Sequence, residues 1–260
     1  MKINLVYNKM IVGYEDVLEQ LETSLIAKKI EFKTLELNSL ENFGDFTIVI
    51  GGDGTILRAA RFYAEWKIAV FGINLGRLGF LSQGFMSEIN SILDAIIEGD
   101  YRTEERLMLT SIDKLALNDF VIKGCDASRT SKFFLEINGK EVCDYIADGI
   151  IISTPTGSTA YGLSAGGPIL YPTLDAITIV PICPHTLNAR PLVVPVTESI
   201  SVKTADRLLA VSIDGYETEK CVEKISIKLS DKKAVLAFLN KDKFYTVLRD
   251  KLHWGISEAI

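Results

Sequence analysis

The sequence has 260 residues, 48% of them hydrophobic, so it can bury one large domain or two smaller ones. Its formal net charge of −6 repels phosphate backbones, which argues against a nucleic-acid partner. No apolar run reaches the length of a membrane span and no signal peptide is evident, so we expect a cytoplasmic protein with no membrane association.

The first hundred residues alternate short strand-like runs with helical ones, a pattern typical of parallel strands joined by crossover helices. Helices are predicted at residues 15–30, where Ile26 belongs to the apolar stripe, and at residues 87–98, which Gly99 ends. We therefore expect residues 1–99 to form an α/β domain, doubly wound with a mostly parallel sheet. Its strands are predicted at residues 3–7, 32–37, 46–50 and 67–73.

After about residue 100 the hydrophobic period changes to two, and the runs become short and β-branched. Asn138-Gly139 between two such runs indicates a hairpin. We expect an all-β, sandwich-like domain at residues 100–242, and a C-terminal helix within residues 243–260 that packs back on the first domain. The β-domain strands are predicted at residues 106–112, 132–137, 149–153, 176–182, 199–203, 208–213, 224–229 and 234–239.

A glycine-rich loop follows the predicted strand at residues 46–50, with the sequence Gly-Gly-Asp-Gly-Thr from Gly51. Glycines let a phosphate approach the backbone, so the loop is typical of a phosphate-binding turn. The acidic Asp53 within it suits a general base that accepts a hydroxyl proton during phosphoryl transfer. The alternative is a tight turn in which Asp53 only caps the following helix.

A second unusual segment, residues 148–168, begins as an apolar strand and continues into a stretch rich in glycine and hydroxyl groups. Small residues let a ligand lie against the backbone, and Tyr161 offers a stacking face beside several hydroxyls. A nucleotide would fit such a surface. The alternative is a glycine-rich turn at a domain junction.

With these motifs the chain resembles the NAD kinase family across nearly its full length. Gly-Gly-Asp-Gly is shared with lipid kinases of the diacylglycerol type and with phosphofructokinases, so residues 148–168 are the specific part. The resemblance rests on residues 51–55, residues 72–80, the pair Asn118-Asp119, residues 148–168 and residues 184–192.

The resemblance implies an enzyme that transfers the γ-phosphoryl group of ATP to the 2′-hydroxyl of the adenosine ribose of NAD. It also implies a divalent metal cation, Mg²⁺, without naming a protein ligand for it. An α/β domain followed by a β-sandwich domain is the family's fold. Its members are homodimers or homotetramers, which implies a homo-oligomer whose NAD sites are completed across a subunit interface.

By position in the family motifs, Asp53 is the expected general base. Asn118 and Asp119 face the adenosine ribose, and Asp148 faces the nicotinamide carboxamide. Asp119 stands where the family usually has glutamate, and Ile146 where many bacterial relatives carry a basic residue, so no contact is carried over to Ile146. The full set of expected ligand-binding residues is Gly52, Asp53, Gly54, Arg58, Phe80, Asn118, Asp119, Arg129, Asp148, Thr156, Thr159, Ala160, Tyr161, Gly162, Leu163 and Ser164.

Two other functions compete with this one. A lipid kinase would share the role of Asp53 but would present a deep apolar cleft or a basic membrane-facing surface, which the acidic composition disfavours. A catalytically silent dinucleotide sensor would bind NAD without turnover, and the intact loop around Asp53 disfavours it.

Overall fold

The computed structural model describes residues 1–76, 79–85, 88–126, 130–185, 188–205, 208–239 and 244–252. The chain divides into two compact units. Unit 1 comprises Met1–Glu105 together with Ala234–Ile260, and unit 2 comprises Arg106–Lys233.

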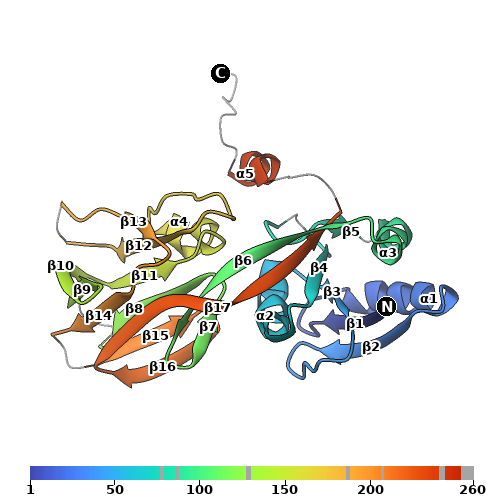
Figure 1. The fold of residues 1–260 in the computed structure, drawn as a ribbon, viewed down its shortest axis with the longest axis horizontal. Helices are drawn as coiled ribbons and strands as arrows, with labels where there is room; N and C mark the ends of the chain where they lie inside the picture. Colours follow the sequence, from blue (N-terminus) through green and yellow to red (C-terminus); the bar gives the residue numbers. More distant parts are fainter. Residues whose placement is uncertain are drawn as a thin grey trace, which may run out of the picture. The chain divides into compact units, whose positions relative to one another are not determined.

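Unit 1 is built on a parallel sheet in the order β2-β1-β3-β4, and the last residues of β17 pair with β4 at its edge (Figure 1). Its strands are β1 (Lys2–Tyr7), β2 (Glu31–Glu36), β3 (Phe46–Ile50), β4 (Ala69–Asn74) and the short β5 (Gly84–Phe85). β1, β3 and β4 are mostly buried, as expected for strands covered on both faces, whereas the edge strand β2 is mostly exposed or half-buried.

Helices cover both faces of this sheet (Figure 1). α1 (Tyr14–Ala27) and α3 (Ile89–Glu98) share one apolar cluster with alternate residues of β1, β3 and β4. α2 (Asp53–Tyr63) packs on the opposite face, and the 3₁₀ turn η1 (Ala64–Trp66) follows it. α5 (Phe244–Leu252) belongs to the same unit. The unit is therefore doubly wound.

Unit 2 consists of two antiparallel layers that share one apolar core. One layer has the order β13-β12-β11-β8-β15-β16, and the other contains β10-β9-β14-β17. Phe120 and Ile150 from the first layer meet Phe133 and Ile200 from the second in that core. The elements are β6 (Arg102–Ser111), β7 (Lys114–Ala116), β8 (Asp119–Gly124), β9 (Ser131–Ile137), β10 (Lys140–Ala147), β11 (Gly149–Ser153), η3 (Gly157–Thr159), α4 (Tyr161–Ser164), β12 (Ala176–Ile182), β13 (Leu192–Pro195), β14 (Ile200–Thr204), β15 (Leu209–Ile213), β16 (Glu217–Val222) and β17 (Lys224–Phe238).

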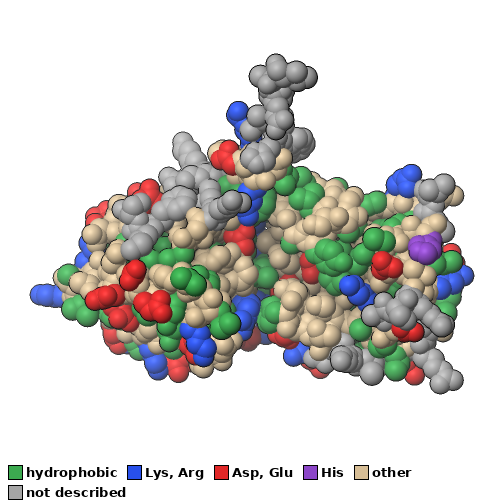
Figure 2. Space-filling view, turned by 180° about the vertical axis from the view of Figure 1, so that it is seen from behind, with side chains coloured by type: hydrophobic (Ala, Val, Ile, Leu, Met, Phe, Trp, Pro, Cys, Tyr) green, Lys and Arg blue, Asp and Glu red, His purple; other side chains and the backbone are tan. Residues whose placement is uncertain are grey.

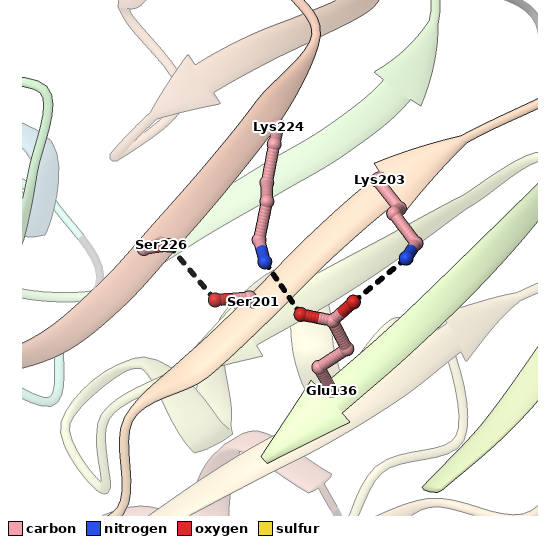
Figure 3. A network of polar contacts seen from close by, with 5 residues as sticks. All are labelled: Glu136, Ser201, Lys203, Lys224 and Ser226. Carbon is pink, nitrogen blue, oxygen red and sulfur yellow. Dashed lines mark hydrogen bonds and ion pairs between the residues drawn. The ribbon is translucent and has the colours of Figure 1, made fainter. Parts of the chain in front are cut away.

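A polar network ties three strands of the second layer together (Figure 3). Glu136 on β9 accepts hydrogen bonds from Lys203 on β14, at 2.8 Å, and from Lys224 on β17. These bonds lower the pKa of Glu136 to about 2. Ser201 and Ser226 share a hydrogen bond of 2.8 Å beside them. Cross-strand pairs of this kind hold neighbouring strands in register.

Among the described residues, no helix has both the length and the apolar character needed to span a bilayer. On the face in Figure 2, acidic and basic side chains of the described residues are interspersed and form no basic band.

The elements agree with the sequence patterns in most places. The hairpin predicted at Asn138-Gly139 is confirmed, because both residues have positive φ and join β9 to β10. Gly99 ends α3 with φ of +77°, also as predicted, whereas Ser87, the N-cap that the sequence indicates for this helix, lies outside the described residues. The prediction for Ile26 was wrong: it is 66% exposed, because the buried stripe of α1 follows Val17 and the leucines four and eight residues later.

Candidate active site

The glycine-rich loop lies where the strand order reverses. β2 and β3 flank β1 within the sheet. The chain therefore moves from β1 to the neighbouring β2, and then crosses to β3 on the opposite flank of β1. The connections after β1 and β3 therefore lead to helices on opposite faces, which opens a crevice at the carboxyl ends of these strands. The two loops meet there, since the Asn8 side chain donates a hydrogen bond of 3.3 Å to the Thr55 hydroxyl.

The backbone of this loop requires glycine at its first position. Gly51 has φ of +154°, and a Cβ added to it would lie 2.7 Å from Cβ of Thr55. By contrast, Gly52 and Gly54 face open space. A phosphate can thus approach the backbone at Gly52 and Gly54 without meeting a side chain.

Asp53 is held by a loop and does not cap its own helix. Gly52 is the N-cap residue of α2, so the alternative in which Asp53 only caps that helix is wrong. The Asp53 carboxylate instead accepts hydrogen bonds from the backbone amides of Phe80, at 2.8 Å, and Leu81, at 3.1 Å. Its side chain is 32% exposed. A fixed, accessible carboxylate is the geometry that a general base requires.

Two glycines of the motif at residues 72–80 allow this motif to pack closely against Asp53 and α2. A Cβ on Gly79 would lie 1.8 Å from Oδ1 of Asp53, so only glycine allows this approach. A Cβ on Gly72 would lie 2.2 Å from Cδ1 of Ile56, so this position lets α2 rest on β4. The sequence motif showed these glycines, but their contact with Asp53 was not predicted.

The C-terminal helix adds a cation to the same place. Nζ of Lys251 lies 3.5 Å from Oδ2 of Asp53 and 4.8 Å from the centre of the Phe80 ring. Phe244, at the start of α5, packs its ring 6.2 Å from that of Phe80. Sequence patterns predicted the helix but gave no signal for Lys251, because its partner is almost 200 residues away in the chain.

Arg58, a further predicted residue of α2, contacts the turn that follows β2. Arg58 is half-buried, and its guanidinium donates a hydrogen bond of 3.0 Å to Asn38. It lies about one turn of helix after Gly54. Its predicted contact with a ligand stays a prediction.

In unit 2, Asn118 and Asp119 lie in a turn that leads into β8. Oδ1 of Asp214 accepts hydrogen bonds from the amides of Asn118, at 2.7 Å, and Asp119, at 3.1 Å. Its Oδ2 accepts a third, from the amide of Leu117, at 3.0 Å. Asp214 was missed, because it lies in the β15–β16 turn, 95 residues after Asp119.

The side chain of Asp119 is in an unfavourable place for a charge. The residue is 3% exposed, and burial together with the nearby Asp214 raises the pKa of Asp119 to about 7. A carboxyl group in such surroundings changes its charge near neutral pH.

A pocket of about 350 Å³ opens beside this turn, within unit 2. Four predicted residues line it, and Asp214 and Lys123 line it as well. Tyr161, at the start of α4, is 40% exposed there. The predicted residues in the wall are Asn118, Asp119, Ala160 and Tyr161.

The hydroxyl-rich segment before α4 uses several of its hydroxyls within the fold. Ser158 donates to the carbonyl of Pro155 at 2.7 Å, and the Thr159 hydroxyl donates to the carbonyl of Thr156 at 3.3 Å. Thr156 is itself buried. Toward α4 the segment becomes more accessible: Gly162 is buried, but Leu163 is half-buried and Ser164 is exposed.

Asp148 is not brought together with these residues within the chain. It is exposed and precedes β11, whereas Asn118 and α4 lie beyond the other end of that strand. Five residues of strand span about 17 Å. Arg129 lies outside the described residues.

Comparison with known proteins identifies the family. Residues 8–101 match the family model for the ATP-NAD kinase N-terminal domain, and residues 117–239 match that for the ATP-NAD kinase C-terminal domain. The chain belongs to the NAD kinase family. The resemblance drawn from the motifs is thereby confirmed, and so are the α/β plus antiparallel β fold and NAD kinase function, a phosphotransferase activity.

Individual relatives agree with this assignment. The NAD kinase of Magnetococcus marinus is 41% identical over 247 residues, covering 88% of this chain and 81% of the relative. The NAD kinase of Thermoanaerobacter sp. is 40% identical over 243 residues, covering 88% and 86%. The structure of an Archaeoglobus fulgidus NAD kinase in complex with ATP is 28% identical, with a TM-score of 0.82 over 97% of this chain and 99% of that one.

Proposed function

We propose that the enzyme transfers the γ-phosphoryl group of ATP to the 2′-hydroxyl of the adenosine ribose of NAD, with Asp53 as the general base. The observation that carries this proposal is the accessible Asp53 carboxylate. It is fixed by the amides of Phe80 and Leu81 beside a glycine loop at the switch point of the sheet. A carboxylate held in that place can accept the proton of a hydroxyl group that is presented to it.

The 2′-oxygen forms a bond to the γ-phosphorus, the bond from that phosphorus to the β,γ-bridging oxygen breaks, and ADP leaves with the electron pair. The hydroxyl proton passes to the Asp53 carboxylate. Backbone amides at the start of α2 face the phosphates of the nucleotide, and the positive end of the helix favours their charge.

Unit 2 supplies the proposed contacts to NAD. Asn118 donates to and accepts from the adenosine ribose, ionised Asp119 accepts from its hydroxyls, and Tyr161 offers its ring to the base. The remaining expected contacts are those of Thr156, Thr159, Ala160, Gly162, Leu163 and Ser164.

We further propose a homo-oligomer, a homotetramer in its largest form. The position of Asp148 supports it, since Asp148 lies at the far end of β11 from Asn118. Its proposed contact with the nicotinamide carboxamide belongs to a site that a second copy of the chain completes. Size-exclusion chromatography with light scattering tests this, and a monomer that remains active contradicts it.

A divalent metal cation, Mg²⁺, is proposed to arrive with the triphosphate. The described residues contain no cluster of three His, Cys, Asp or Glu side chains able to hold a metal ion. Magnesium at phosphate sites is bound largely by phosphate oxygens and water, with one or two carboxylates, so the chain need not provide a complete site. Bound in this way, the ion neutralises charge on the phosphate oxygens.

A cytoplasmic location is also proposed. Cys125, Cys143 and Cys183 are free thiols in the structure. Thiols persist in reducing compartments.

The test is the formation of NADP from NAD, with ATP, another triphosphate or polyphosphate supplied in turn as donor, with and without Mg²⁺. NADP is expected with wild-type protein, and at least about 10²-fold more slowly with Asp53→Asn. A silent sensor would bind NAD without forming NADP. A lipid kinase would consume ATP only with a lipid alcohol.

A further inference from the structure

The turn formed by Leu117, Asn118 and Asp119 is anchored on its amide side by one carboxylate. All three consecutive amides donate to Asp214, at 2.7 to 3.1 Å. In return, the Asp214 amide donates to the carbonyl of Asp119 at 3.0 Å. Hydrogen bonds to a carboxylate are about twice as strong as neutral ones. The orientation of the whole turn therefore depends on Asp214.

The carbonyl side of the same turn is anchored by the start of the hydroxyl-rich segment. The Thr154 hydroxyl donates to the carbonyl of Leu117 at 2.6 Å, and its amide donates to the carbonyl of Asn118 at 2.9 Å. A Cβ on Gly157 would lie 2.2 Å from that Asn118 carbonyl oxygen. The turn is thus held between two elements, and two of its residues, Asn118 and Asp119, line the pocket of about 350 Å³.

The carboxylate of Asp214 is both an anchor for the turn and a second negative charge near Asp119. Its two oxygens together accept three amide hydrogen bonds, and an Asn side chain, with one acceptor oxygen, would replace only part of this set. Burial, and after it the charge of Asp214, raises the pKa of Asp119. The same carboxylate therefore affects both the position and the ionisation of Asp119.

We propose that Asp214 is a positioning residue for NAD: its carboxylate orients Asn118 and Asp119 toward the ribose and sets the protonation state in which Asp119 meets it. This inference rests on the proposed function, in which ionised Asp119 accepts hydrogen bonds from ribose hydroxyls. Asp214 itself acts only through the turn and through its charge.

The ionisation of Asp119 depends on the charged and titratable groups around it. The pocket wall contains Asp214, Lys123 and Tyr161 besides Asp119 itself. Lys123 would favour the ionised form, whereas the pKa of Asp119 is raised, first by burial and then by Asp214. Removing the charge of Asp214 must then shift the titration of Asp119 to lower pH.

The experiment compares Asp214→Asn with Asp113→Asn. Asp113 is a matched control, because it is also an aspartate with positive φ, at +57° against +51° for Asp214, in another turn of unit 2. For Asp214→Asn we expect KM for NAD to rise about tenfold while KM for ATP changes less than twofold. We also expect the acid limb of kcat/KM for NAD to move to lower pH. Asp113→Asn should leave all three unchanged.

A purely structural role would lower activity and thermal stability without moving the acid limb, and that result overturns the proposal. If Asp214→Asn does not fold, Asp119→Asn provides the test. This variant removes the group that titrates and, with it, a buried charge. The acid limb near pH 7 must then disappear from kcat/KM for NAD, and its persistence overturns the proposal. Wild-type protein that forms no NADP refutes the proposed function instead, so the two failures are distinguishable.

Discussion

Asp53 is the first residue of α2 in unit 1 and Asp119 is the first residue of β8 in unit 2, and the surroundings of the two carboxylates are opposite. Asp53 is contacted by donors, namely two backbone amides and the ammonium of Lys251, and about a third of its side chain is exposed. Asp119 is buried and lies near a second carboxylate, Asp214. The first arrangement fixes a reactive group within reach of substrate, and the second produces a group whose charge changes near pH 7.

The largest expected effect comes from removing the carboxylate of Asp53. Asp53→Asn should lower kcat by at least about 10²-fold, because the amide cannot accept the hydroxyl proton. NAD affinity, measured by calorimetry, should change little. Asp45→Asn is the control, since Asp45 is an exposed carboxylate of unit 1 that accepts one amide hydrogen bond, from Lys2. Equal losses in both variants would contradict the role of Asp53.

Neutralising Asp119 should raise the free energy of unfolding and at the same time weaken the binding of NAD. The pKa of Asp119 is raised to about 7, so the folded chain keeps a proton between about pH 4 and pH 7 that the unfolded chain releases. Stability from this group is therefore present at low pH and is lost as pH rises through 7. We expect Asp119→Asn to raise the free energy of unfolding at pH 8 by about 2 kcal/mol, and by much less at pH 5.

Urea unfolding at the two pH values measures this difference, with Asp113→Asn as the control. A gain of the same size at pH 5 and pH 8 would show that Asp119 does not titrate in this range. The variant should at the same time bind NAD more weakly, because it loses a carboxylate acceptor for the ribose.

Hydrophobic periodicity was enough to predict most of the fold. The predicted strands at residues 46–50, 149–153 and 176–182 coincide with β3, β11 and β12, because they are continuous buried runs. The pattern failed at β17, which was expected as two strands. Buried positions of β17 change from odd to even numbers between Ile227 and Ser230, so alternation alone indicates a break where the strand continues.

The site was predictable only in its local parts. The glycine loop with Asp53, and the pair Asn118-Asp119, are visible because their residues are adjacent in sequence. Their contacts are not: Phe80 was predicted only as a motif residue and is 27 residues from Asp53, and Asp214, which was not predicted, is 95 residues from Asp119. Contacts at that separation depend on how strands and turns are arranged, and a single sequence carries no periodic signal for them.

A smaller effect is expected from crowding Asp53 without changing it. In Gly79→Ala the new methyl group would lie 1.8 Å from Oδ1 of Asp53, so the carboxylate or the loop must move. A displaced catalytic group should lower kcat about tenfold. Gly76→Ala is the matched control, since nothing lies within 4 Å of a Cβ at Gly76. Steady-state kinetics and thermal unfolding of both variants distinguish a shifted carboxylate from a destabilised loop.

The smallest effect should come from Lys251, the charged partner of Asp53. Both side chains are about one-third exposed, so the pair contributes no more than about 1 kcal/mol. We expect Lys251→Met to lower kcat about two- to fivefold, because a cation beside the reacting groups stabilises the charge of the phosphoryl group in transfer. Salt should weaken this difference, since partly exposed charges are screened. Kinetics at low and high salt test it, with Arg249→Met on the same helix as the control. An equal loss in both variants would assign the effect to α5 as a whole and not to the ammonium group at Asp53.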